Sequence, residues 1–162
     1  MSTPYNAIFD KFIRKLKGDN QFFNYRNLSE DEVKVILDDH MTSLLERAID
    51  KLYSYGLPDI NFYDKDDIGQ SFTESLVPQE ISLLSDLMYL AYIEEDRNKL
   101  KAYGMQFRTS EIDVLFSPAN DRKTYLDMLE TIEASIFNSV VTYFSRDRLT
   151  WKEKSIYGGQ YE

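Results

Sequence analysis

Few residues of the chain have the types and spacing that catalysis requires. His40 is the single histidine, and it follows Asp38 and Asp39, so an imidazole with a carboxylate to orient it could act as a general base. The chain has no cysteine, and no motif for a Ser/His/Asp or Cys/His nucleophile is present. We therefore interpret His40 as a solvated side chain on the polar side of a helix. We expect no enzymatic activity and no catalytic residues.

The acidic segment DKDDIGQSFTE shares part of the pattern of a calcium-binding loop. Asp64, Asp66 and Gly69 stand at the first, third and sixth positions of an EF-hand loop. Ile68 occupies the fifth position and Ser75 the last, where an oxygen ligand and a bidentate Glu are required. We therefore expect a turn-rich acidic loop, with no metal site and no other cofactor.

The final segment SRDRLTWKEKSIYGGQYE, residues 145–162, contains the only Trp and interleaves basic with aromatic side chains. Trp, Tyr and Arg are the types that anchor protein interfaces, whereas disordered segments are poor in large aromatic residues. We predict a docking segment that extends beside a neighbouring chain, in the manner of a strand added to a sheet edge. The residues expected to dock are Arg146, Arg148, Trp151, Lys152, Lys154, Ile156, Tyr157 and Tyr161. Two alternatives stay open: a strip that stacks single-stranded nucleic acid, and a frayed end without a partner.

Composition indicates a single folded domain. The chain has 162 residues, of which 43% are hydrophobic and 14% aromatic, a length typical of one domain and a content too apolar for intrinsic disorder. No apolar run approaches the roughly 18 residues that span a bilayer. The first residues lack the basic and then apolar pattern of a secretion signal. We expect a protein that stays in the cytoplasm where it is made, without membrane association.

The net charge of −9 is unevenly distributed along the chain. Residues 1–17 hold four basic side chains and one acidic one, and residues 145–162 hold four basic and three acidic ones. Residues 18–144 hold 24 acidic and 11 basic side chains. An acidic body repels the phosphates of nucleic acid, so sequence-specific DNA binding is not expected. The basic ends could instead pair with acidic neighbours, including other copies of the chain.

Apolar residues recur at helical spacing in four segments. We expect the first helix to have Thr3 as its N-cap and Pro4 as its first residue, and to end at Gly18. A second helix is expected over residues 29–55, opened by a capping box at Ser29. The residues expected on its buried face are Val33, Ile36, Leu37, Met41, Leu44, Leu45, Ala48, Ile49 and Leu52.

An irregular insertion, residues 57–77, follows the second helix, and INFY within it could form a short strand. A third helix restarts at Pro78, with an end or a bend expected at the polar residues 94–97. Because it is apolar on many sides, it should be central in the domain. The last and longest helix spans about residues 120–146, with apolar residues at a period near 3.6 over its whole length.

These elements predict an all-α fold, a bundle of four main helices with an irregular middle insertion and an extended C-terminal tail. We expect no internal repeat. The expected organisation is a helical bundle domain over residues 1–148 and a docking tail over residues 149–162.

The chain resembles the small helical neck proteins of tailed phages that infect Firmicutes. The resemblance rests on four segments: TPYNAIFDKFIRKL, LSEDEVKVILDDHMTSLLERAI, LLSDLMYLAYIEEDRNKL and DRKTYLDMLETIEASIFNSVVTYFSR. In that family a short amphipathic helix is followed by a second helix, a variable middle, a hydrophobic third helix and a long last helix. The shared features are patterns of helix faces over nearly the whole chain.

This resemblance implies a head–tail connector, that is, a head-completion or adaptor protein of the phage neck. Such a protein would form a homo-oligomeric ring below the portal, expected to be twelvefold, and would contact the portal protein and neighbouring neck or tail proteins. Genomic DNA would pass through the lumen without specific binding. The implied location is the virion neck, after synthesis in the host cytoplasm. The alternative is a cytosolic helical binding or regulatory module that docks a partner protein through its aromatic tail.

Overall fold

The computed structural model of the protein describes residues 2–16, 29–106 and 118–154. It is mostly helical and contains four helices and three short strands within these residues. The helices are α1 (Asn6–Lys15), α2 (Glu30–Tyr55), α3 (Pro78–Gln106) and α4 (Pro118–Ser145). The strands are β1 (Thr3–Pro4), β2 (Lys65–Asp66) and β3 (Ser71–Phe72).

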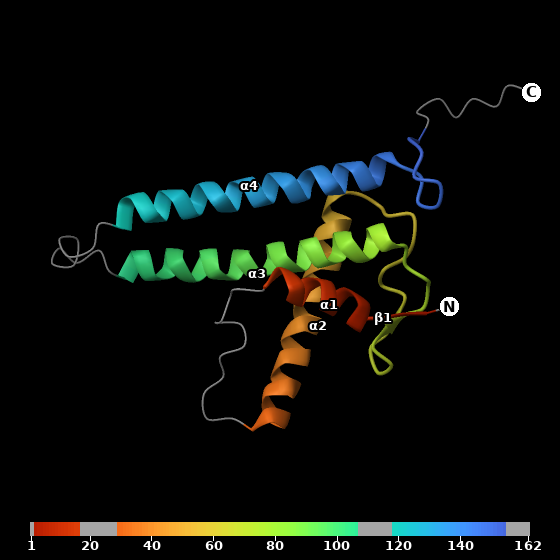
Figure 1. The fold of residues 1–162 in the computed structure, drawn as a ribbon, viewed down its shortest axis with the longest axis horizontal. Coiled ribbons are helices and arrows are strands. Elements are labelled where there is room, and N and C mark those ends of the chain that lie inside the picture. The colour runs from red at the N-terminus through yellow and green to blue at the C-terminus, as the bar shows by residue number, and fades with distance from the viewer. Residues whose placement is uncertain (1, 17–28, 107–117, 155–162) are drawn as a thin grey trace, which may run out of the picture.

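Helix α3 is the centre of the fold, as its many-sided apolar pattern predicts. It packs against α1, α2 and α4, and Leu84, Leu87 and Met88 on it are fully buried. Figure 1 shows α3 and α4 side by side and antiparallel, with α2 crossing them and α1 next to α2 and α3. The joined ends of the α3–α4 pair extend past α1 and α2, so part of this pair stands out from the body.

The predicted all-α class needs a correction, because the three strands form a small antiparallel sheet in the order β1–β3–β2. Phe72 of β3 lies opposite Thr3 of β1 and opposite Lys65 of β2. Two-residue strands are too short to show an alternating pattern, so periodicity could not reveal them. The strand suggested for INFY is not formed, and Phe62 of that segment is instead fully buried in the core.

Thr3 does not cap the first helix as predicted. It lies in β1 and its Oγ1 accepts a hydrogen bond of 2.8 Å from the backbone N–H of Leu76. Helix α1 begins after Tyr5, whose buried ring meets Phe72 edge-on, with 5.2 Å between ring centroids. Residues 3–5 are therefore bound to the middle insertion by a hydrogen bond and by ring packing. These contacts cover one end of the core.

The capping box at the start of α2 is confirmed. The Glu32 N–H donates to Ser29 Oγ, and the Ser29 N–H donates to the Glu32 carboxylate at 2.9 Å. The two bonds that the Glu32 carboxylate accepts from Ser29, the one from the backbone N–H first and then the one from the hydroxyl at 2.7 Å, lower the pKa of Glu32. Deep burial nevertheless begins only at Met41. Ile36, which was predicted to be buried, is 38% exposed, and Val33 and Leu37 are half-buried. The predicted buried face of α2 is therefore correct from Met41 onward and wrong at Ile36, and Figure 1 shows this end of α2 leading away from α3.

The helix end predicted at residues 94–97 is not present, since α3 is continuous from Pro78 to Gln106. Glu94 forms an ion pair with Lys51 of α2, and Glu95 forms one with Arg47. The polar residues Glu94 and Glu95 thus form ion pairs between two packed helices, α3 and α2.

Candidate protein-docking surfaces

Residues 145–154 close into a compact turn at the end of α4, which we call the C-terminal turn. The Asp147 N–H donates to the carbonyl of Lys152 at 2.7 Å, and the Lys154 N–H donates to the carbonyl of Ser145 at 2.8 Å. Each of these bonds joins the outgoing chain to the last residues of the helix. The chain therefore reverses direction within this segment.

The side chain of Asp147 organises this turn. Its Oδ1 accepts hydrogen bonds from the Leu149 N–H at 3.1 Å and from the Thr150 N–H at 2.8 Å. The bonds from Thr150, the backbone one first, lower the pKa of Asp147. Trp151 then takes a φ of 58°, a left-handed conformation that is uncommon outside glycine. The prediction of an extended tail from residue 149 is thus corrected for residues 149–154, which fold back on α4.

Arg148, which was expected to dock on a partner, binds a buried carboxylate of its own chain. Its Nε and Nη2 donate to the two oxygens of Glu80 at 2.6 and 3.1 Å, and Nη2 also donates to the carbonyl of Ser75. Glu80 is 0% exposed and is the one fully buried acidic side chain among the described residues. It also accepts a bond of 2.8 Å from the Val77 N–H at the start of α3. Burial, and then the charge of Glu80, raise the pKa of the neighbouring Tyr143.

Trp151 lies half-buried against its own molecule. The guanidinium carbon of Arg146 lies 5.7 Å from the centroid of its ring, in a cation–π arrangement. Trp151 also lines a groove of about 390 Å³ between α1, α3 and α4, which we call the α1/α3/α4 groove. Other side chains that line it include Lys11, Ser82, Leu83, Ser139 and Tyr143. The described contacts of Trp151 are therefore intramolecular, and they place it beside an open groove.

The other predicted docking residues divide between solvent and the part of the chain outside the described residues. Lys152 is exposed. Lys154 is also exposed, and its Nζ lies 2.7 Å from a carboxylate oxygen of Asp59. Leu149, which the sequence did not single out, is 78% exposed. Ile156, Tyr157 and Tyr161 lie outside the described residues.

Helix α4 carries apolar side chains on a side that α3 does not cover. Its core-facing residues are Leu129, Ile136, Val140 and Tyr143. Leu126, Phe137 and Val141 are 37%, 48% and 49% exposed, and their spacing puts them on one side of the helix. We call these three residues the outer α4 stripe. The apolar period of α4 is thus correct, but it describes a surface wider than one neighbouring helix can bury.

The outer α4 stripe continues onto the end of α2. The ring of Phe137 meets the ring of Tyr55 edge-on, with 5.8 Å between centroids. Tyr55 is itself 39% exposed. Leu90, Glu130 and Ala134 line the same shallow cleft as these two rings. The result is an apolar surface with acidic side chains at its margin.

The two sequence candidates for chemistry are engaged in structural contacts. His40 is half-buried, and its Nε2 lies 3.4 Å from Glu95 Oε2 on α3, so it is less solvated than expected. In the acidic loop, Asp66 Oδ1 accepts the N–H groups of Ile68 and Gly69, each at 3.0 Å, and so closes the turn between β2 and β3. No group of three or more potential metal ligands occurs among the described residues.

Sequence reasoning missed Glu80 and the groove. Glu80 stands three residues after Val77 and two after Pro78, which is the spacing of a helix-capping acid, so its role at the start of α3 was readable. Its pairing with Arg148 and the groove lined by Lys11 depend on how distant elements pack, for which the sequence holds no local signal.

No protein-family model matches the chain, and neither does any curated protein or solved structure. Within the described ranges, every helix is too short or too polar to cross a bilayer.

Proposed function

We propose that this chain is a structural virion protein of a tailed-phage neck, where it forms a connector or adaptor ring between the portal and the tail. The starting point is the resemblance of its four helical segments to phage neck proteins. Support comes from the arrangement of α1 to α4, which are the same four segments, around a central α3. The projecting α3–α4 pair offers long helix surfaces beyond the body for contacts with other subunits (Figure 1).

The outer α4 stripe is the observation that carries this proposal. Three large apolar side chains, each between a third and a half exposed, lie on one side of α4, next to the side that packs in the core. Exposed apolar surfaces of this kind mark interaction sites in soluble proteins. In a closed ring every subunit must contact like subunits on two sides. We assign the outer α4 stripe to contact with a neighbouring copy.

Charge supports the same role. Residues 18–144 carry 24 acidic and 11 basic side chains, and ion pairs such as Lys51–Glu94 and Arg47–Glu95 neutralise only part of the acidic set. An acidic lumen lets DNA slide without adsorbing, because like charges repel. In a ring of these subunits we expect Asp and Glu to outnumber Lys and Arg on the lumen side. A neutral or basic lumen would contradict this expectation.

The decisive experiment is a symmetry-resolved reconstruction of the particle neck, combined with one substitution in the outer α4 stripe. Val141→Glu places a charge at the expected contact between copies, where burial of an unpaired charge is strongly unfavourable. Thr131→Glu puts the same charge on an exposed position of the same helix and is the matched control. Both variants should unfold with free energies within about 0.5 kcal/mol of the parent. Only Val141→Glu should remove the ring from particles.

A second test concerns the end of the chain. Ending the chain after Arg148 would also remove most of the C-terminal turn, so the informative truncation comes after Lys154, where the described contacts end. This shortened chain should fold but fail to join the neck. A chain that acts as a cytosolic regulator should instead remain small in purified form and be absent from virions. Normal neck assembly with both Val141→Glu and the truncation would contradict the connector role.

A further inference from the structure

We infer that the α1/α3/α4 groove receives residues 155–162 of a neighbouring copy of the chain. This inference rests on the proposed function and deepens it, because it names a contact that links successive subunits of the ring. The contacts of Trp151 with its own molecule do not fill the groove, and the inferred segment would occupy it.

The groove offers a positive charge at one end. Lys11 Nζ donates to Ser82 Oγ at 2.7 Å and to the Pro78 carbonyl at 3.4 Å, and both acceptors are neutral oxygens. The nearby carboxylate of Asp86 is paired with Lys15. A carboxylate placed beside Lys11 would therefore form a hydrogen bond in which both donor and acceptor are charged, which the present partners of Lys11 do not provide.

The walls of the groove suit aromatic side chains with a hydroxyl group. Leu83 and Tyr143 are buried residues whose side chains line the groove, and Trp151 forms a half-buried aromatic wall. Ser82 and Ser139 add hydroxyl groups along it. Its volume of about 390 Å³ lies near the lower end of the roughly 300–1,000 Å³ of ligand sites. One or two side chains of an extended peptide fit such a volume, whereas a whole helix does not.

The segment SIYGGQYE, residues 155–162, has the complementary chemistry. It carries Ile156, Tyr157 and Tyr161 as large apolar groups, and Glu162 is its single charged side chain. Glu162 would meet Lys11 while a tyrosine ring lies against Trp151. The Gly158-Gly159 pair has no side chains, so it allows the backbone to approach the groove walls closely. Fully extended, the segment reaches at most about 26–29 Å.

The anchoring of Lys154 favours a neighbouring copy over the same molecule. After Trp151 the chain leaves the groove, and Lys154 is held both by the carbonyl of Ser145 and by Asp59 in the loop that follows α2. Lys154, the last described residue, is therefore held beside the loop that follows α2 and not in the groove. A subunit that gives one segment and receives another makes a head-to-tail contact, and contacts of this kind close into rings.

Cysteine crosslinking in the full chain tests this contact directly, because the natural sequence contains no cysteine. One variant carries Ser139→Cys in the groove and a second carries Gln160→Cys in the segment; the two are mixed at high concentration under mild oxidation. We expect a disulfide-linked heterodimer in at least about tenfold excess over the yield with Ser54→Cys. Ser54 is an equally exposed helix serine that lies outside the groove, and a tenfold ratio corresponds to about 1.4 kcal/mol of contact energy.

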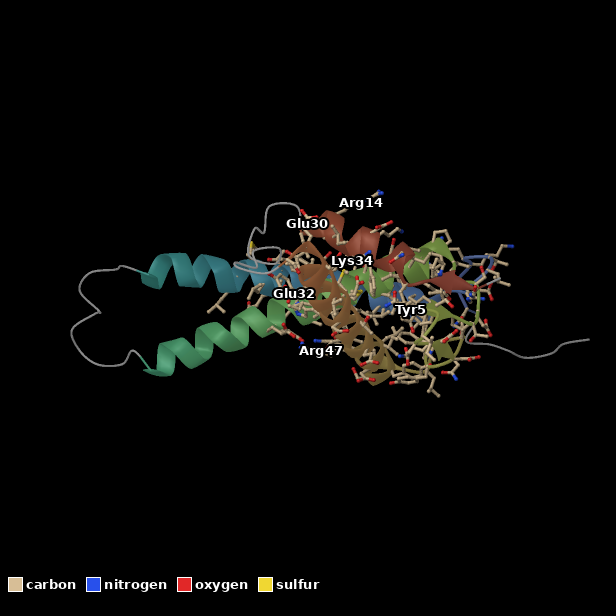
Figure 2. All side chains as sticks on the ribbon, turned by 90° about the horizontal axis from the view of Figure 1, so that it is seen from below. Tyr5, Arg14, Glu30, Glu32, Lys34 and Arg47 are labelled. Carbon is tan, nitrogen blue, oxygen red and sulfur yellow. The ribbon has the colours of Figure 1, made fainter. Side chains whose placement is uncertain are left out.

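Two charge variants of α1 test whether Lys11 contributes to binding of the segment. Lys11→Met in the groove partner should lower the heterodimer yield about tenfold, since one charge-assisted hydrogen bond is lost. Arg14→Met is the matched control; Arg14 is exposed on α1 and points away from the body in Figure 2, and its loss should leave the yield unchanged.

Three other outcomes overturn the inferred contact, and a fourth separates it from the connector role. Equal yields with Ser139→Cys and Ser54→Cys would mean that the segment does not bind the groove. A double variant that forms only an intramolecular disulfide, with no heterodimer in the mixture, would place the segment on its own molecule. A ring on virions without the crosslink would leave the connector role intact and remove only this contact. The crosslink without any ring on virions would remove the connector role and keep the self-association.

Discussion

Replacement of Arg148 by Met should destabilise the fold far more than replacement of any exposed cation in the same turn. The Arg148 side chain is 16% exposed and that of Glu80 is 0% exposed, so Arg148→Met leaves a carboxylate buried without its cation. Removal of one partner of a buried ion pair typically costs about 3–5 kcal/mol. For a chain of this size that lowers the unfolding midpoint by about 6–20 °C.

The matched control is the exposed pair in the same turn. Lys154 and Asp59 have side chains 40% and 33% exposed, and exposed pairs contribute about 0–1 kcal/mol. Lys154→Met should therefore lower the midpoint only slightly. Urea and thermal unfolding, followed by circular dichroism and by the fluorescence of the single Trp, measure both effects.

A double variant tests the cause. Glu80→Gln removes the buried charge but keeps a carbonyl oxygen that can accept the Val77 N–H, which Glu80 accepts at 2.8 Å. Glu80→Gln together with Arg148→Met should therefore be more stable than Arg148→Met alone, since the unpaired charge is gone. The reasoning is refuted if Arg148→Met costs less than about 1 kcal/mol, the upper value for an exposed pair. It also fails if the double variant is no more stable than the single one.

Three further predictions concern other contacts. Thr3→Val removes the acceptor of the buried Leu76 N–H and should cost about 1–3 kcal/mol in urea unfolding, whereas Thr3→Ser, which keeps the hydroxyl, should cost clearly less. The pKa of Asp147 is lowered in the fold, so its stabilisation of the turn is present above its ordinary value of about 3.9 and is lost as the pH falls through the lower folded value. Trp151 fluorescence should therefore change below about pH 4 in the parent, and Asp147→Ala should show the altered signal already at neutral pH. Ile68, at the tip of the β2–β3 turn, is 99% exposed, so Ile68→Lys should change the unfolding free energy by no more than about 0.5 kcal/mol; a larger loss would show that Ile68 is buried in solution.

The helices could be read from the sequence because their signals are local. The capping box at Ser29 and the glycine at position 56 bound α2 within a residue of its observed ends, and Pro78 marks the first residue of α3. Apolar periodicity also identified the core residues of α1, such as Ile8 and Phe12. These signals arise within one or two helical turns, so no tertiary knowledge is required.

The remaining features depend on contacts between distant parts of the chain. Arg148 and Glu80 are 68 positions apart, and each looks like a surface residue when read alone. The polar residues 94–97 indicate an end or a bend of a helix when read alone, because Lys51, the partner of Glu94, belongs to a different helix. For α4 the apolar period can be read from the sequence, but the extent to which neighbouring helices cover the apolar side chains cannot. The apolar side chains left uncovered form the outer α4 stripe.

The contacts of the C-terminal turn link folding to the candidate docking groove. Arg148 binds Glu80 at the start of α3 and so joins the C-terminal turn to that helix. The same turn places Trp151 at the edge of the groove. A substitution that loosens Arg148 should therefore weaken both the fold and any peptide bound beside Trp151. Changes beyond Lys154, or at Val141 on the outer α4 stripe, lie outside this chain of contacts. They are consequently the changes that can abolish assembly while the folded subunit stays intact, and they are the ones by which assembly should be judged.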